Sequence, residues 1–191
     1  MKAILIFFLL PMPLFGQQKA APKWHEPSSF AGIKFGVPLS TSIQECPKSI
    51  LGAGVAAYDI EAADGPCFEI VASFLSVYGV DGFKEIMVEE INGKVESLGC
   101  IFAAEDGIDI SRSLIARFGS PRLTWTAPRQ NAYGVVVHDH VLEWTGPNVS
   151  ILYHSVSQNA DEGLIDIRTR IFDAYEKKQR LQKEGALAHS F

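Results

Sequence analysis

Residues 83–102 read FKEIMVEEINGKVESLGCIF, and this stretch decides the fold. Two runs of β-type residues flank Asn92 and Gly93, which both tolerate the positive φ angles of a type I′ turn. An Asn-Gly pair between two such runs is a strong hairpin signal. The run CFEIVASFLSVYG at 67–79 lies before it, with the turn sequence GVDG between them. We therefore predict a three-stranded antiparallel meander over residues 68–103.

A helix is predicted directly after this meander, over residues 106–118. Ile108, Ile115 and Phe118 lie on one side of such a helix, and the polar residues lie away from it. Gly119 suits the position just past the helix end, and a proline two residues later prevents continuation. The glycine and proline of FGSP thus read as a helix stop, whereas a phosphate-binding loop needs glycines before a helix.

A second meander is predicted beyond the helix, with strands at about 133–145, 149–156 and 164–173. In the first half, one or two helical turns are expected between Ser40 and Pro47. The expected fold class is therefore α+β, with two antiparallel three-stranded meanders. Each meander is expected to be preceded by a helical segment, and the helices are expected to pack on one face of the sheet.

The chain divides by composition into four segments. These are a signal peptide at 1–16, a polar lead-in at 17–29, a single α+β domain at 30–173 and a polar C-terminal tail helix at 174–191. The element order allows the domain to be read as two duplicated halves, 30–103 and 104–173.

The first residues have the order of a secretory signal. Lys2 precedes an apolar run that ends near Phe15, and Gly16 is a small residue where a peptidase can cut. No cysteine follows the run directly, so a lipid anchor is not expected. We expect a periplasmic or secreted protein with no stable membrane insertion after cleavage. An uncleaved membrane anchor is the alternative.

The charge of the chain disfavours nucleic acid as a partner. There are 17 lysine and arginine residues against 22 aspartate and glutamate residues, which gives a formal net charge of −5. A protein that binds the phosphate backbone needs a stripe of basic residues. The basic residues near the C-terminus alternate with glutamates, a pattern typical of a solvated helix face.

The three cysteines fit an oxidising compartment. Cys46 and Cys67 each adjoin a proline at the border of an element, and a bridge between them closes a loop of about twenty residues. Cys100 is then a buried free thiol in an apolar strand. The other two pairings stay open on the sequence alone.

The stretch VVVHDHVLEW at 135–144 raises the question of a metal site. His138 and His140 point to the same face of a strand, and a catalytic zinc needs a third ligand, for which His154 is the candidate. A hairpin register that puts Trp144 opposite Val149 keeps the apolar faces together. That register turns His154 away from the other two histidines, which argues against the site.

Other residues are candidates for partner binding. Trp125 and Tyr133 could anchor an interface, because Trp and Tyr are enriched at binding hot spots. Glu61 and Asp64 could bind a cation or a basic partner, or could belong to a solvated acidic loop. The aromatic residues Trp144 and Tyr153 are instead expected in the core, beneath the helix that ends at Phe118. No catalytic residues and no cofactors are predicted.

These motifs resemble those of a group of secreted bacterial domains. The pattern is a helix ending in L-x-x-x-FG-x-P, then strands of the form L-x-W and I-x-L, with NGK-V upstream, and it covers roughly residues 84–156. It is similar to the β-lactamase-inhibitor-protein-like fold and to outer-membrane assembly lipoproteins of the SmpA/OmlA type. The residues that match are Leu114, Phe118, Gly119, Pro121, Leu142, Trp144, Ile151, Asn92, Gly93, Lys94 and Val95.

The resemblance implies a mode of action without a cofactor, in which a sheet face or loops are presented to another protein. The chain lacks the lipidated cysteine of the lipoproteins, so attachment to the outer membrane is not implied. We therefore expect an exported, non-catalytic binding module whose partner is a protein or another envelope component. The alternative is a small metal-dependent or serine hydrolase that uses His138 and His140. A third hypothesis, a carrier for a small apolar ligand, requires a cavity.

Overall fold

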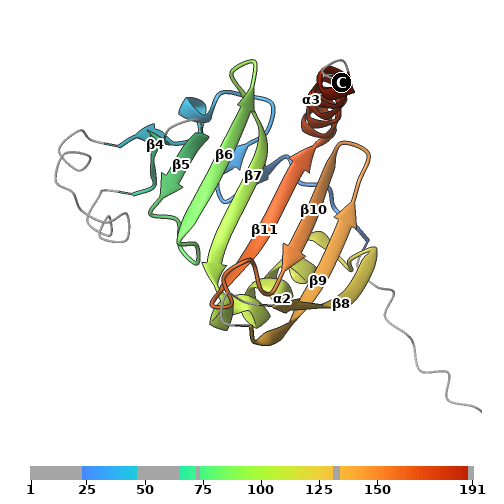
Figure 1. Cartoon of the computed structure of the whole chain (residues 1–191). Coiled ribbons are helices and arrows are strands. Elements are labelled where there is room, and N and C mark those ends of the chain that lie inside the picture. Colours follow the sequence, from blue (N-terminus) through green and yellow to red (C-terminus); the bar gives the residue numbers. More distant parts are fainter. Residues whose placement is uncertain (1–22, 47–64, 72–73, 131–133, 189–191) are drawn as a thin grey trace, which may run out of the picture.

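One large sheet organises the protein (Figure 1). The computed structural model describes residues 23–46, 65–71, 74–130 and 134–188. In these residues nine strands form the sheet, in the spatial order β3-β4-β5-β6-β7-β11-β10-β9-β8. All neighbours in it run antiparallel except β3 and β4, which are parallel. The strands are β3 (Gln44–Glu45), β4 (Cys67–Val71), β5 (Phe74–Tyr78), β6 (Glu85–Ile91), β7 (Lys94–Ala103), β8 (Leu123–Gln130), β9 (Val136–Thr145), β10 (Val149–His154) and β11 (Glu162–Thr169).

Two α-helices occur in the described residues, and each comes after four consecutive strands. Helix α2 (Gly107–Phe118) follows β7, and α3 (Arg170–Ala188) follows β11. The other short elements are β1 (Ser29–Phe30), β2 (Ile33–Lys34) and two 3-10 turns, η1 (Leu39–Thr41) and η3 (Ala104–Asp106). The strands β7 and β11 pair at the centre of the sheet, so that the last strand of each group of four joins the two halves.

The predicted fold class is therefore wrong. The protein has a single nine-stranded mixed sheet in place of two three-stranded meanders. Helix α2 precedes the second group of strands as expected, but in the described residues no α-helix precedes the first group. The run predicted as one strand at 67–79 forms two paired strands, β4 and β5. The stretch around Trp125 has the composition of a turn, yet it forms β8. Pro128 is tolerated in β8 because this is an edge strand.

The apolar face of the sheet packs against α2. The prediction that Trp144 and Tyr153 are core residues is confirmed, since their exposed fractions are 1% and 2%. The side chains of both residues also form hydrogen bonds to the two ends of helix α2. Trp144 Nε1 donates to the carbonyl of Gly119 at 2.8 Å, and the Tyr153 hydroxyl donates to the carbonyl of Gly107 at 2.8 Å. Gly119 has a φ of 89°, which explains the glycine at the helix end.

Two local predictions are confirmed at the hairpin and the disulfide. Asn92 and Gly93 have φ angles of 54° and 72° and connect β6 to β7. Cys46 and Cys67 form a disulfide, and Cys100 is a buried free thiol. Since disulfides persist mainly in oxidising compartments, the bridge fits an exported protein.

The predicted register of the β9–β10 hairpin is wrong by two residues. Trp144 faces Ile151 instead of Val149. The carboxylate of Glu26 accepts hydrogen bonds from the backbone N–H groups of Asn148 and Val149, both at 2.6 Å, and so fixes the connection. A shift of two residues leaves every side chain on its expected face, because strand side chains alternate with a period of two.

Candidate functional site: the open face of the sheet

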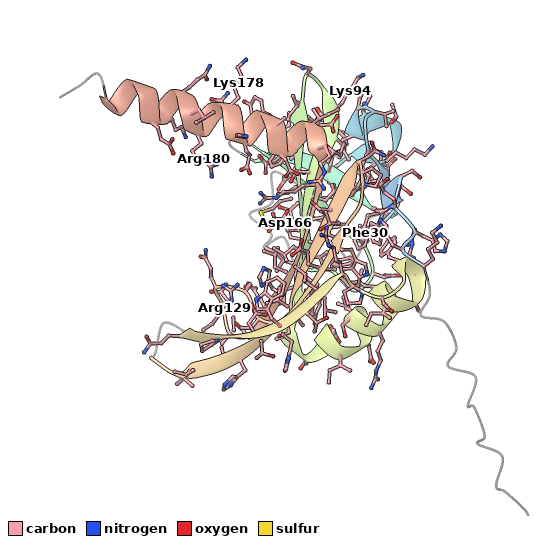
Figure 2. All side chains as sticks on the ribbon, turned by 90° about the vertical axis from the view of Figure 1, so that its right-hand side faces the viewer. Phe30, Lys94, Arg129, Asp166, Lys178 and Arg180 are labelled. Carbon is pink, nitrogen blue, oxygen red and sulfur yellow. A yellow bond between two sulfur atoms is a disulfide. The ribbon has the colours of Figure 1, made fainter. Side chains whose placement is uncertain are left out.

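The two faces of the sheet differ in what covers them. In Figure 2, α2 and the N-terminal elements lie on the same side as Phe30, whereas Asp166 and Arg129 point to the other side. We call this second side the open face. Helix α3 projects from one end of it, and the ends of β8 and β9 project from the other. Cross-strand pairing places on the open face Glu85, Met87, Glu89, Ser97, Gly99, Ile101, Leu164, Asp166, Arg168, Ser150, Leu152, His154, Asp139, Val141, Glu143, Leu123, Trp125, Ala127 and Arg129.

A largely apolar row crosses the middle of the open face. Residues paired directly across strands place Ile101, Leu164, His154, Val141 and Trp125 side by side, from β7 to the edge strand β8. Ile101, Leu164 and His154 are partly buried. Val141 is 1% exposed, whereas Trp125 is 41% exposed. The sequence-predicted binding residue Trp125 thus stands at the accessible end of an apolar row.

A shallow cavity of about 380 Å³ lies beside this row. Its lining includes Gly99, Asp166 and Arg168, from β7 and β11. The Arg168 guanidinium binds the carboxylate of Asp166 at 2.6 Å and that of Glu176 on α3 at 2.9 Å. These ion pairs connect the first turns of α3 to the sheet.

The acidic groups around this cavity outnumber the basic ones. Burial raises the pKa of Glu89, and the nearby charges of Glu176 and Asp166 raise it further, while Arg168 acts in the opposite direction. Two acidic neighbours thus act on Glu89 against one guanidinium. A partner that brings a positive charge to this cavity would be favoured electrostatically.

A buried carboxylate marks the other end of the open face. The side chain of Asp139 is 0% exposed, and it accepts hydrogen bonds from Arg129 Nε at 2.7 Å and from His154 Nδ1 at 2.7 Å. The backbone N–H of Val156 donates to its second oxygen at 3.2 Å. Burial by itself raises the pKa of Asp139, but the hydrogen bonds from His154, Arg129 and Val156 outweigh burial and lower it.

The Asp139–His154 pair has the geometry that orients an imidazole. An ionised carboxylate can only accept, so His154 Nδ1 carries the proton in this hydrogen bond. A general base also needs a nucleophile within hydrogen-bond reach. In the described part of the chain, His154 makes no hydrogen bond to a serine, threonine or cysteine side chain. The geometry therefore supports an ion-pair network that connects β8, β9 and β10.

The three histidines considered for a metal do not lie on one face. His138 and His140 are exposed on the side opposite to the open face, and His140 Nδ1 lies 3.2 Å from Thr126 Oγ1. His154 lies on the open face with Asp139. Within the described ranges, no group of three His, Cys, Asp or Glu side chains is placed to hold a metal ion.

The remaining sequence-predicted residues fall outside what the structure describes. These are Glu61, Asp64 and Tyr133. Conversely, sequence reasoning did not single out Arg129, Asp166 or Arg168. The alternation of LIDIRT at 164–169 does carry a signal for two of these residues, since it places Asp166 and Arg168 on the face opposite to the buried isoleucines.

Comparison with known proteins does not assign the chain to a family. No family model, no curated protein and no solved structure matches it. Among the described residues, no helix is both long enough and apolar enough to span a membrane.

Proposed function

We propose that this protein is an exported, non-catalytic binding module that holds a protein partner of the cell envelope on the open face of its sheet. The observation that carries the proposal is the apolar row that ends at the exposed indole of Trp125. Protein interfaces combine an apolar centre with a polar rim, and aromatic residues supply most of their hot spots. The open face has both features.

The surroundings of the row supply the polar rim. Asp166 and Arg168 lie on one side of the row, and Arg129 lies on the other. These charged groups are held by ion pairs within the protein, so little conformational entropy is lost when a partner docks. The resemblance to envelope domains that present a sheet face favours the same mode of binding.

Export to the periplasm or to the medium belongs to this proposal. The apolar run at the start of the chain has the order of a secretory signal. The Cys46–Cys67 disulfide supports it independently, since cytosolic thiols are kept reduced.

The test is a photo-crosslinking comparison between two exposed apolar positions. A photoreactive amino acid is placed at Trp125, on the open face, or at Ile108, which is 66% exposed on α2 on the opposite side. We expect position 125 to form one prominent crosslink in cells that make the protein, and position 108 to form none. Equal crosslinking from both positions, or only from position 108, would overturn the proposal.

A further inference from the structure

A second cavity, of about 400 Å³, lies away from the open face, beside the start of α3. Its walls are mainly apolar and come from separate parts of the chain. Phe35 belongs to the N-terminal segment, Val149 begins β10, and Ile171 lies in the first turn of α3. Glu96 on β7 also lines it. Ligand sites in proteins are typically apolar concavities of this size with a few polar groups.

The walls of this cavity are fixed before any ligand binds. Glu26 accepts from the backbone of Asn148 and Val149. The Arg170 guanidinium donates to the carbonyl of Gly146 at 2.9 Å, and the Arg170 backbone N–H donates to the carbonyl of Asn148 at 2.8 Å. The N-terminal segment, the β9–β10 connection and α3 are therefore mutually attached, and a ligand loses little affinity to ordering.

Glu96 is the unusual group in the lining. Glu96 is 2% exposed. Such deep burial is rare for a carboxylate that has no paired charge. One oxygen, Oε2, accepts from the hydroxyl of Thr169, and that hydroxyl accepts from the backbone N–H of Phe172 in the first turn of α3. In the part of the chain that the structure describes, the carboxylate of Glu96 makes no other hydrogen bond and no ion pair.

The charges around the cavity favour a cation. Glu26 and Glu96 contribute two carboxylates, and the pKa of Glu26 is lowered because the hydrogen bonds from Val149 and Asn148 outweigh its burial. One guanidinium, that of Arg170, lines the same space, where its charge helps to lower the pKa of Glu26, and it also pairs with Asp173 at 3.2 Å. Among the described residues, no charged side chain donates to the carboxylate of Glu96.

We propose that this cavity binds a small apolar molecule that carries a primary ammonium group. The ammonium donates a hydrogen bond to the carboxylate of Glu96, and the alkyl or aryl body of the molecule lies against Phe35, Val149 and Ile171. The site is separate from the open face, and it does not depend on the function proposed there. The alternative is that Glu96 has a structural role alone, which is to hold the Thr169 hydroxyl at the start of α3.

The probe is hexylamine, with hexan-1-ol as its uncharged counterpart, titrated into the folded protein and followed by backbone amide NMR. We expect saturable shifts around Glu96 and Val149 with the amine and at least about tenfold weaker binding of the alcohol. Glu96→Gln should weaken amine binding about tenfold. Equal binding of amine and alcohol, or an unchanged affinity in Glu96→Gln, would overturn the proposal.

A second pair of variants does not depend on the buried carboxylate. Ile171 and Leu181 are both exposed on α3, at 58% and 55%, but only Ile171 lines the cavity. Ile171→Lys places an ammonium group at the mouth of the cavity, where it competes with hexylamine for Glu96. We expect Ile171→Lys to weaken binding about tenfold and Leu181→Lys to leave it unchanged. Equal affinities in the two variants would count against the site.

Discussion

Nδ1 of His154 donates a hydrogen bond to the fully buried carboxylate of Asp139, with 2.7 Å between the two heavy atoms. The two residues come from the end of β10 and from the neighbouring strand β9, and Arg129 of the edge strand β8 completes the network. The projecting end of the open face is thus held by charge as well as by backbone pairing. Burying a carboxylate without hydrogen-bond donors costs free energy, so loss of these donors or of the carboxylate should lower the stability of the protein.

Asp139→Asn should destabilise the protein by about 2 kcal/mol, because the variant loses the ionic part of two hydrogen bonds in a buried position. The measurement is the free energy of unfolding from urea denaturation. Asp109→Asn is the matched control, since the pair of Asp109 with Arg112 is exposed on both sides. The control should change stability by less than about 0.5 kcal/mol. Equal effects of the two substitutions would show that the Asp139 network contributes no more than a surface pair.

The contribution of Asp139 should depend on pH in a defined direction. Its pKa in the folded protein lies below the usual 3.8, so the ionised form is favoured by folding. The stabilisation is fully present above about pH 4 and is lost as the pH falls through the lowered pKa. The difference in unfolding free energy between the native protein and Asp139→Asn should therefore shrink below about pH 4. A difference that stays constant from pH 7 to pH 3 would contradict this assignment.

The attachment of α2 can be tested through one hydroxyl group. Tyr153→Phe removes the donor to the carbonyl of Gly107 and leaves that buried acceptor unpaired. We expect a loss of about 1–2 kcal/mol in the free energy of unfolding. Tyr175→Phe is the control, because Tyr175 is 45% exposed and its hydroxyl makes no hydrogen bond to the described residues. A loss in Tyr175→Phe as large as that in Tyr153→Phe would contradict the account.

The cysteines should respond differently to reagents. Cys100 is 0% exposed, and burial raises the pKa of its thiol, so it should not react with a thiol reagent in the folded protein. After unfolding without reductant, one thiol per chain should be labelled. Reduction of the Cys46–Cys67 bridge should lower stability by about 3 kcal/mol. Labelling of Cys100 in the folded state at the rate of a free thiol in solution would contradict the burial of this residue.

The parts of the fold that were predictable depend on short stretches of sequence. The Asn92-Gly93 hairpin and helix α2 carry their own turn and stop residues, so local chemistry identifies them. The pairing of β7 with β11 depends on strands about sixty-five residues apart, and no local pattern encodes it. Edge strand β8 was not predicted, because its own composition favours a turn. Pairing with β9 stabilises it as a strand.

The candidate site shows the same division between local and distant determinants. Face alternation placed His154 on the face away from His138 and His140, as the structure has it, because that property survives a register shift of two residues. The connection that closes this register is bound by Glu26, more than 120 residues away from the hairpin that it contacts. The partnership of Asp139 with Arg129 likewise requires β8 to lie beside β9.

The central claim is that the open face holds a partner. The most direct measurement uses the partner identified by crosslinking, purified, and compares its affinity for two alanine variants of the protein. Trp125→Ala removes the exposed anchor of the apolar row, and Ile108→Ala removes an exposed apolar side chain from the opposite side. We predict at least about a tenfold loss of affinity for Trp125→Ala and a change within about twofold for Ile108→Ala. Equal affinities for the two variants would contradict the claim.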